Sequence, residues 1–204
     1  MIFKKDKQYC IICLERNGGE IQMKYYKLLY DGNHGDEWIF LTFDESELPF
    51  NKYDIYESKR IPVTKIYCSI AECPHGDCDY LANDLSFLIV SEKVKTIFER
   101  FNLCDCQFIE VFEKGTERFL GYLVNCLEHY EALDEENARY EKFPDDPLIP
   151  LIVIRFAILE EKVKEKDFFQ LQEDIFPYFI SDRLKRALKK AHVIGFDFDQ
   201  LIAP

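Results

Sequence analysis

An internal repeat constrains the fold of this chain more than any other feature of its sequence. Residues 88–95 align with residues 178–185 at an offset of 90 positions. In both copies apolar residues continue at i, i+3, i+4 and i+7, the spacing that forms one apolar face of a helix. These residues are Val94, Ile97, Phe98 and Phe101 in the first copy and Leu184, Ala187, Leu188 and Ala191 in the second.

Each copy of the repeat contains the signals of a strand, a capped helix and a returning strand. Ser91 and Ser181 stand just before the two helical patterns, and each is followed by an acidic residue, which favours a helix N-terminus. Gly195 supplies a turn after the second helix. The repeat therefore predicts two related strand–helix–strand units, over residues 88–111 and 178–201.

The N-terminal part has a different pattern. Short runs rich in Ile, Leu, Tyr and Phe at residues 8–15, 25–30 and 38–43 are separated by turn residues, which is typical of antiparallel strands. Residues 44–66 contain two prolines and many charges and predict a long irregular connection. The expected fold class is therefore α+β, with an N-terminal antiparallel sheet and a C-terminal part that contains the two related units.

Two further strands are predicted between the copies of the repeat, at residues 119–127 and 147–159. The second is nearly all apolar, so we expect a central strand covered on both faces. One compact domain of residues 1–204 is favoured, because no flexible Gly/Ser linker is present. The alternative is a division into a β-rich part, 1–80, and a duplicated part, 81–204.

Charge and hydropathy restrict the partners and the compartment. The 204 residues include 26 Lys and Arg against 38 Asp and Glu, a net charge of −12 that disfavours nucleic acid and favours a basic partner. We read no secretion signal, and the most apolar run, residues 148–159, is too short to span a bilayer. The expected setting is the cytoplasm, where the eight cysteines would be reduced thiols.

Two acidic surfaces are candidate sites for a protein partner. One is residues 36–57, and the other is residues 131–146, where aromatic residues interleave the carboxylates as interfaces favour. The second is preferred, although acidic runs are often ordinary solvated loops or exposed helices. Its predicted contacts are Glu131, Asp134, Glu135, Glu136, Tyr140 and Phe143.

A cysteine-rich turn is a candidate metal site. Cys68, Cys73, His75 and Cys78 place four soft ligands within 11 residues, around a proline and a glycine that permit tight turns, as a tetrahedral zinc site needs. The alternative is that these are buried thiols and one loop histidine, since free cysteine is often buried. No other cofactor is expected.

The sequence contains no catalytic signature. It has no Gly-x-Ser-x-Gly, no His-Glu-x-x-His and no phosphate-binding glycine-rich loop. Helix capping explains the repeated Ser91 and Ser181 without a nucleophilic role. We therefore expect a protein that is not an enzyme.

Five segments in and around the repeat form a recognisable arrangement: Asp79-Tyr80-Leu81, Phe87 to Lys95, Asp167 to Leu171, Phe179 to Lys185, and Gly195 to Phe198. This arrangement resembles a bacterial family of immunity proteins, which are assigned to polymorphic toxin systems chiefly because their genes lie beside toxin genes. The resemblance covers roughly residues 24–204. It implies a cytoplasmic, non-catalytic protein that binds a cognate toxin and inhibits it by occlusion. The alternative function is a zinc-stabilised interaction module or adaptor unrelated to toxins.

Overall fold

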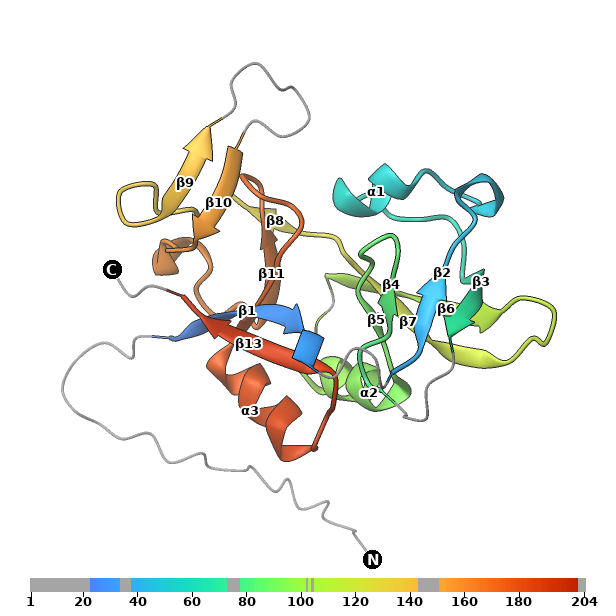
Figure 1. Ribbon diagram of the computed structural model, residues 1–204. Helices are drawn as coiled ribbons and strands as arrows, with labels where there is room; N and C mark the ends of the chain where they lie inside the picture. Colours follow the sequence, from blue (N-terminus) through green and yellow to red (C-terminus); the bar gives the residue numbers. More distant parts are fainter. Residues whose placement is uncertain are drawn as a thin grey trace, which may run out of the picture.

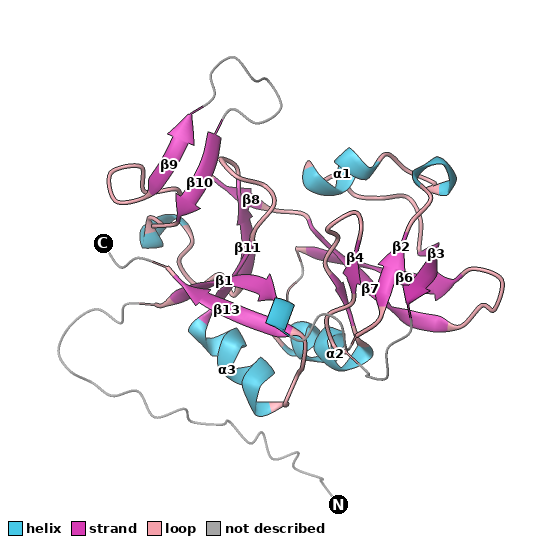
Figure 2. Cartoon of the chain, in the orientation of Figure 1, coloured by secondary structure: helices cyan, strands magenta, loops and turns pink. Residues whose placement is uncertain are grey.

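The computed structural model is an α+β protein built mostly of strands (Figures 1 and 2). It describes residues 23–33, 38–72, 78–101, 103, 105–142 and 151–201. The α-helices are α1 (Lys52–Tyr56), α2 (Glu92–Arg100) and α3 (Asp182–Lys190), and two 3-10 turns are η2 (Glu45–Glu47) and η3 (Glu160–Lys162). The strands are β1 (Tyr25–Tyr30), β2 (Phe40–Thr42), β3 (Lys65–Glu72), β4 (Ala82–Asn83), β5 (Ile89–Val90), β6 (Cys106–Glu113), β7 (Phe119–Cys126), β8 (His129–Tyr130), β9 (Arg139–Lys142), β10 (Leu151–Arg155), β11 (Phe168–Leu171), β12 (Tyr178–Ser181) and β13 (Phe196–Gln200).

The strands form two large sheets and one ribbon. The five-stranded sheet has the order β13-β1-β12-β11-β8, and the six-stranded sheet has the order β4-β2-β3-β6-β7-β5. The ribbon contains β9 and β10, paired antiparallel. Figure 1 shows the two sheets in separate halves of the molecule, with α2 and α3 on the same side of both and the ribbon extending from the half that holds β8 and β11.

The expected N-terminal sheet does not form from the described residues. β1 lies between β12 and β13, antiparallel to both, whereas β2 and β3 join β6 in the other sheet. The N-terminal strands are thus divided between the two sheets. β1 lies between the two strands of the second copy of the repeat, and β3 pairs with β6, the last strand of the first copy. Residues 44–66, expected to be irregular, contain η2 and α1. The predicted strand at residues 8–15 lies outside the described residues.

The two copies of the repeat occupy equivalent places in the two sheets. β5 and β6 flank β7, and β12 and β13 flank β1, with antiparallel pairing in all four cases. Each first strand also pairs antiparallel on its other side, through the Tyr80–Val90 bridge in one half and the Phe168–Ile180 pair in the other. The middle strand of the first unit, β7, therefore follows the first copy in sequence. The middle strand of the second unit, β1, precedes the second copy.

Serine caps begin both helices of the repeat, and each cap is held by a buried aspartate. The Ser91 hydroxyl accepts from the Val94 N–H and donates to Asp79, and the Ser181 hydroxyl accepts from the Leu184 N–H and donates to Asp167. Each aspartate also pairs with the cation two positions after the serine, Lys93 in one copy and Arg183 in the other. The same device therefore fixes the start of both helices.

The main apolar cluster is shared by both copies of the repeat. It contains buried residues of α2 and of α3, together with strands from both sheets. A second cluster fills the half that holds β2, β3 and α1, and a third lies between the ribbon and β11. Among the described helices, none is long and apolar enough to cross a membrane.

Gly195 ends the turn after α3, at a position where a side chain would be both strained and crowded. Its φ is +86°, in the left-handed region that favours glycine. A Cβ atom there would collide with Cys78 Sγ and lie 3.3 Å from the backbone nitrogen of Tyr80. The glycine therefore allows the second copy of the repeat to pack closely on the segment that precedes the first.

Candidate functional site

Of the preferred acidic segment, residues 131–146, the structure describes residues 131–142, which form a turn and a strand. Residues 131–138 connect β8 to β9, and β9 pairs with β10 to form the ribbon. Glu131, Glu135 and Glu136 are exposed on this turn. Residues 131–142 are therefore neither a helix nor an unstructured loop, and the turn holds its carboxylates in a defined position. Phe143 lies outside the described residues.

Asp134 has a structural role in this turn. It is only 7% exposed, and its carboxylate accepts hydrogen bonds from the backbone N–H groups of Glu136 and Asn137 and from the Asn137 side chain. A carboxylate that satisfies its own turn has little surface left for a partner. Of the contacts predicted on this turn, Asp134 is therefore not available to a partner, and the three exposed glutamates remain.

Tyr140 faces inward from the ribbon. It is opposite Val153 in the β9–β10 register, packs on the third apolar cluster, and donates a 2.9 Å hydrogen bond to Glu135. Neighbouring residues of a strand point to opposite faces. Glu141 and its cross-strand neighbour Ile152 are therefore on the outer face, with Glu141 exposed.

The outer face of the ribbon carries two exposed isoleucines that sequence reasoning missed. Ile152 and Ile154 are each 46% exposed, while Val153 between them is buried. The expectation of a central strand over residues 147–159 is therefore wrong. β10 belongs to a two-stranded ribbon that covers the core with one face only, and a continuous apolar run cannot reveal that its outer face is uncovered.

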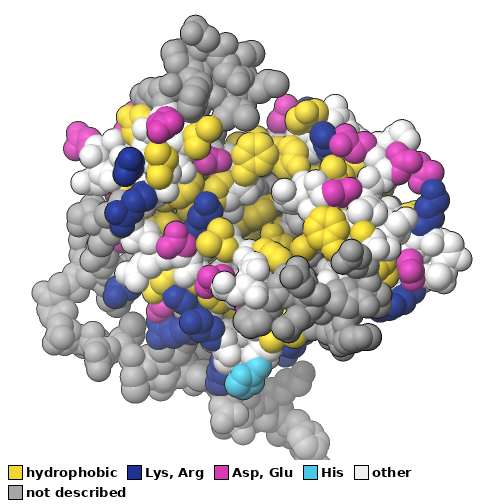
Figure 3. All heavy atoms as spheres, viewed as in Figure 1, with side chains coloured by type: hydrophobic (Ala, Val, Ile, Leu, Met, Phe, Trp, Pro, Cys, Tyr) yellow, Lys and Arg dark blue, Asp and Glu magenta, His cyan; other side chains and the backbone are white. Residues whose placement is uncertain are grey.

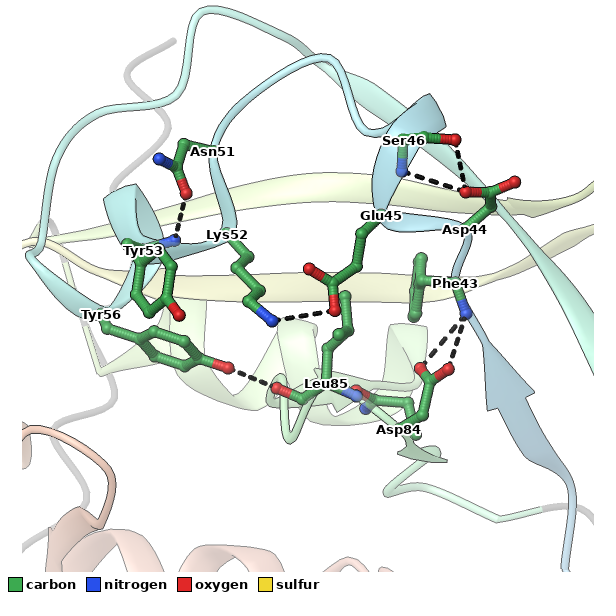
Figure 4. Close-up of polar contacts among 11 residues, drawn as sticks. Phe43, Asp44, Glu45, Ser46, Asn51, Lys52, Tyr53, Tyr56, Asp84 and Leu85 are labelled. Carbon is green, nitrogen blue, oxygen red and sulfur yellow. Dashed lines mark hydrogen bonds and ion pairs between the residues drawn. The ribbon is translucent and has the colours of Figure 1, made fainter.

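Of the second acidic surface, residues 36–57, the structure describes residues 38–57, which contain η2 and α1 and are called the α1 surface below (Figure 4). Asp36 and Glu37 lie outside the described residues. Asn51 caps α1 by accepting from the Tyr53 N–H at 3.1 Å, and Asp44 accepts from Ser46 to cap η2. Lys52 reaches from α1 to Glu45 at 2.8 Å. Two more lysines bind carboxylates of this surface: Lys59 pairs with Asp54 and Glu57, and Lys114 pairs with Glu47.

The two acidic surfaces differ in how their charge is used. Four carboxylates of the α1 surface are in ion pairs with lysines of the same chain. In the part of the chain that the structure describes, Glu131 and Glu136 form no ion pair. The turn before β9 therefore leaves more uncompensated negative charge for a partner.

Exposed aromatic rings lie on the α1 surface and beside it. Tyr53 and Phe176 are 53% and 55% exposed, and the ring of Tyr56 lies between them, 6.3 Å from Tyr53 and 5.3 Å from Phe176 between centroids. Phe176 belongs to the β11–β12 loop of the other half of the molecule. Figure 3 shows hydrophobic side chains gathered along the middle of this face, between the two halves.

The two described cysteines of the candidate zinc site, Cys68 and Cys78, are both buried thiols. Cys68 is buried in the second apolar cluster, where burial raises the pKa of its thiol to about 12. Cys78 donates to the carbonyl of Tyr80 at 2.9 Å, and burial raises the pKa of this thiol to about 11. Cys73 and His75 lie outside the described residues. Among the residues that the structure describes, no group of three or more His, Cys, Asp or Glu could hold a metal. The zinc site stays a prediction.

A serine–histidine pair joins the two halves of the molecule. The Ser58 hydroxyl after α1 lies 2.5 Å from His129 Nε2 in β8. Burial lowers the pKa of His129, and the neighbouring group that opposes this effect is the Gln170 amide. A Ser-His-Asp site would place a carboxylate in that position. The arrangement therefore fits a structural contact at the junction of the halves.

Comparison with known proteins identifies one family. The family model described as "Immunity protein family (Imm11)" matches residues 45–202, which include both copies of the repeat and both acidic surfaces apart from residues 36–44. No curated protein matches the chain.

Proposed function

Because the chain belongs to the Imm11 immunity protein family, we propose that it binds a cognate bacterial toxin in the cytoplasm and inhibits it by occlusion, without catalysis. Family membership over residues 45–202 is the observation that carries this proposal. Inhibition of this kind needs a surface complementary to the toxin in shape and charge, and it needs no catalytic group.

The charge of the chain supports a basic partner. With a net charge of −12, the protein would attract a basic toxin over long range and speed its association. Nuclease toxins meet this requirement, because a surface that grips phosphates is rich in Lys and Arg. Nucleic acid and the membrane surface are not partners in this proposal.

We place the contact on the turn before β9 and the outer face of the ribbon. Glu131, Glu135 and Glu136 would steer the toxin, and Ile152 and Ile154 would be buried against it, since interfaces combine an apolar centre with a polar rim. Tyr140 would act indirectly, because its hydroxyl holds Glu135 from the inner face. The α1 surface, with Tyr53 and Phe176, is the alternative contact face.

Co-expression with the product of the adjacent gene, which the proposal expects to be the toxin, tests the proposal. Growth should be restored, and the two proteins should elute together on size-exclusion chromatography. Hydrogen exchange on the complex would then locate the contact, with protection of residues 131–142 and 151–155 as the expected result. Failure to restore growth or to form a complex would refute the immunity function. Protection confined to α1 and the β11–β12 loop would refute the placement alone.

A further inference from the structure

The β6–β7 hairpin holds two cysteines directly opposite each other. Cys106 of β6 is in register with Cys126 of β7, and the strands are antiparallel. The Leu127 N–H donates to the Asp105 carbonyl at 2.7 Å, so these two residues form a hydrogen-bonded pair and the adjacent cysteine pair is of the non-hydrogen-bonded kind. Such pairs bring Cα atoms to about 4.5 Å, which is within the roughly 4.4–6.8 Å range of disulfides.

The other side of β7 supports this assignment. The Val124 N–H donates to the Leu88 carbonyl at 2.8 Å, so its backbone polar groups point toward β5 and away from β6. Backbone groups alternate in direction along a strand. Those of Cys126, two residues further on, therefore also point away from β6, and the two cysteine side chains share one face of the hairpin at close range.

The two thiols differ in access. Cys126 is 2% exposed and belongs to the main apolar cluster, whereas Cys106 is half-buried at the border of that cluster. The hydrogen bond from Cys106 lowers the pKa of Cys126 against the opposing effect of burial. Cys106 is thus the thiol that a small molecule reaches first, and Cys126 is a buried nucleophile beside it.

The other described cysteines lack these features. Burial raises the pKa of Cys68 to about 12 and that of Cys78 to about 11. Because the thiolate is the nucleophile in disulfide chemistry, these two thiols should react slowly.

We propose that Cys106 and Cys126 form a reversible dithiol–disulfide site that reacts with a low-molecular-weight disulfide such as oxidised glutathione. The Cys106 thiolate attacks one sulfur of the glutathione disulfide, forms a mixed disulfide and releases one glutathione thiolate. The Cys126 thiolate then attacks the Cys106 sulfur and releases the second. The two protein thiols lose two electrons, the glutathione disulfide gains them, and the two thiol protons pass to the released glutathione.

The bond would form at the junction of the two halves. The Cys126 thiol donates to the Glu128 carbonyl at 3.3 Å, and the Glu128 carboxylate pairs with Lys166 at 2.7 Å. Residues 127 and 128 connect β7 of the six-stranded sheet to β8 of the five-stranded sheet. Oxidation would replace the thiol donor with a covalent cross-link in the adjacent hairpin. This site does not depend on the proposed toxin binding.

Peptide mapping of the full-length chain tests the proposal. The reduced protein is equilibrated with mixtures of reduced and oxidised glutathione, free thiols are blocked with iodoacetamide, and linked peptides are identified by mass spectrometry. We expect a Cys106–Cys126 linkage that dithiothreitol reverses. Cys126→Ala should leave a stable glutathione adduct on Cys106, whereas Cys106→Ser should leave Cys126 unmodified. The control Cys68→Ala should form the same linkage to the same extent.

Three outcomes would overturn the proposal. In the first, Cys106 and Cys126 both stay open to alkylation while other cysteines of the chain oxidise. In the second, Cys126 is linked to another cysteine, such as Cys104, more than to Cys106. In the third, the linkage forms equally well in guanidinium chloride, which would mean that nearness in sequence produces it and strand pairing does not.

Discussion

The Ser91 hydroxyl donates a 2.6 Å hydrogen bond to the carboxylate of Asp79, which lies 12 positions earlier in the chain. The same carboxylate accepts from the Ile194 N–H at 2.9 Å and pairs with Lys93 at 2.7 Å. Asp79 therefore joins the start of α2 to the turn that follows α3. One buried side chain connects the two copies of the repeat.

Replacing Asp79 with alanine should destabilise the fold. The Ser91 hydroxyl and the Ile194 N–H would lose their acceptor, and unsatisfied buried donors should lower the free energy of unfolding by about 2–3 kcal/mol in total. Urea denaturation measures this change. Lys93→Met removes the exposed cation of the ion pair and its 3.1 Å hydrogen bond to the His192 carbonyl, and it should cost much less because both contacts are reached by solvent. Equal losses for the two variants would mean that the ion pair, and not the buried hydrogen bonds, stabilises this junction.

The helices of the repeat could be predicted from sequence because their signals are local. A serine cap and an i, i+3, i+4, i+7 apolar face are complete within one segment, and they mark α2 and α3. The place of β1 could not be predicted, because its partners in β12 and β13 lie 150 to 174 positions later in the chain and a local sequence pattern does not indicate them. The exposed face of β10 was missed for the same reason. Whether Ile152 and Ile154 are covered depends on which strands lie beside the ribbon.

Gly195→Ala should be more harmful than Gly115→Ala, although both glycines have a φ near +85°. At Gly115 a Cβ atom meets nothing within 4 Å, so the cost is backbone strain of about 1–2 kcal/mol. At Gly195 the same strain is joined by a collision with Cys78 Sγ and a tight contact with Tyr80, which should add about 1–3 kcal/mol. Thermal and urea unfolding of the matched pair measure the difference. Equal stabilities would show that Cys78 can move aside.

His129 should make the fold less stable in mild acid. Burial lowers the pKa of its imidazole, so the unfolded chain binds a proton more readily than the folded chain. The stability contributed by neutral His129 is full above the unfolded pKa of about 6.5 and is lost as the pH falls toward the folded pKa. Ser58 and Gln170, the described groups beside the ring, carry no charge that would offset this effect.

The His129→Gln variant isolates this dependence. Other groups titrate in both proteins, so the informative quantity is the difference between wild type and variant in the urea midpoint, measured between pH 5 and pH 7.5. Wild type should lose more stability than the variant over this interval. Parallel curves would indicate that His129 is protonated equally in the folded and unfolded states.

The proposed toxin contact predicts separate kinetic effects for its charged and apolar residues. The double variant Glu135→Lys, Glu136→Lys should slow association and weaken the dependence of its rate on salt. Exposed charges at the rim of an interface act mainly on the rate at which the two proteins meet. Ile152→Ser should chiefly speed dissociation, because a buried apolar contact is lost only after docking. Surface plasmon resonance at two salt concentrations measures both rates. The double variant Glu45→Lys, Glu57→Lys, on the α1 surface, makes the same change in net charge and is the control. If the control slows association more than the change at Glu135 and Glu136, the toxin docks on α1 and the ribbon is not its binding face.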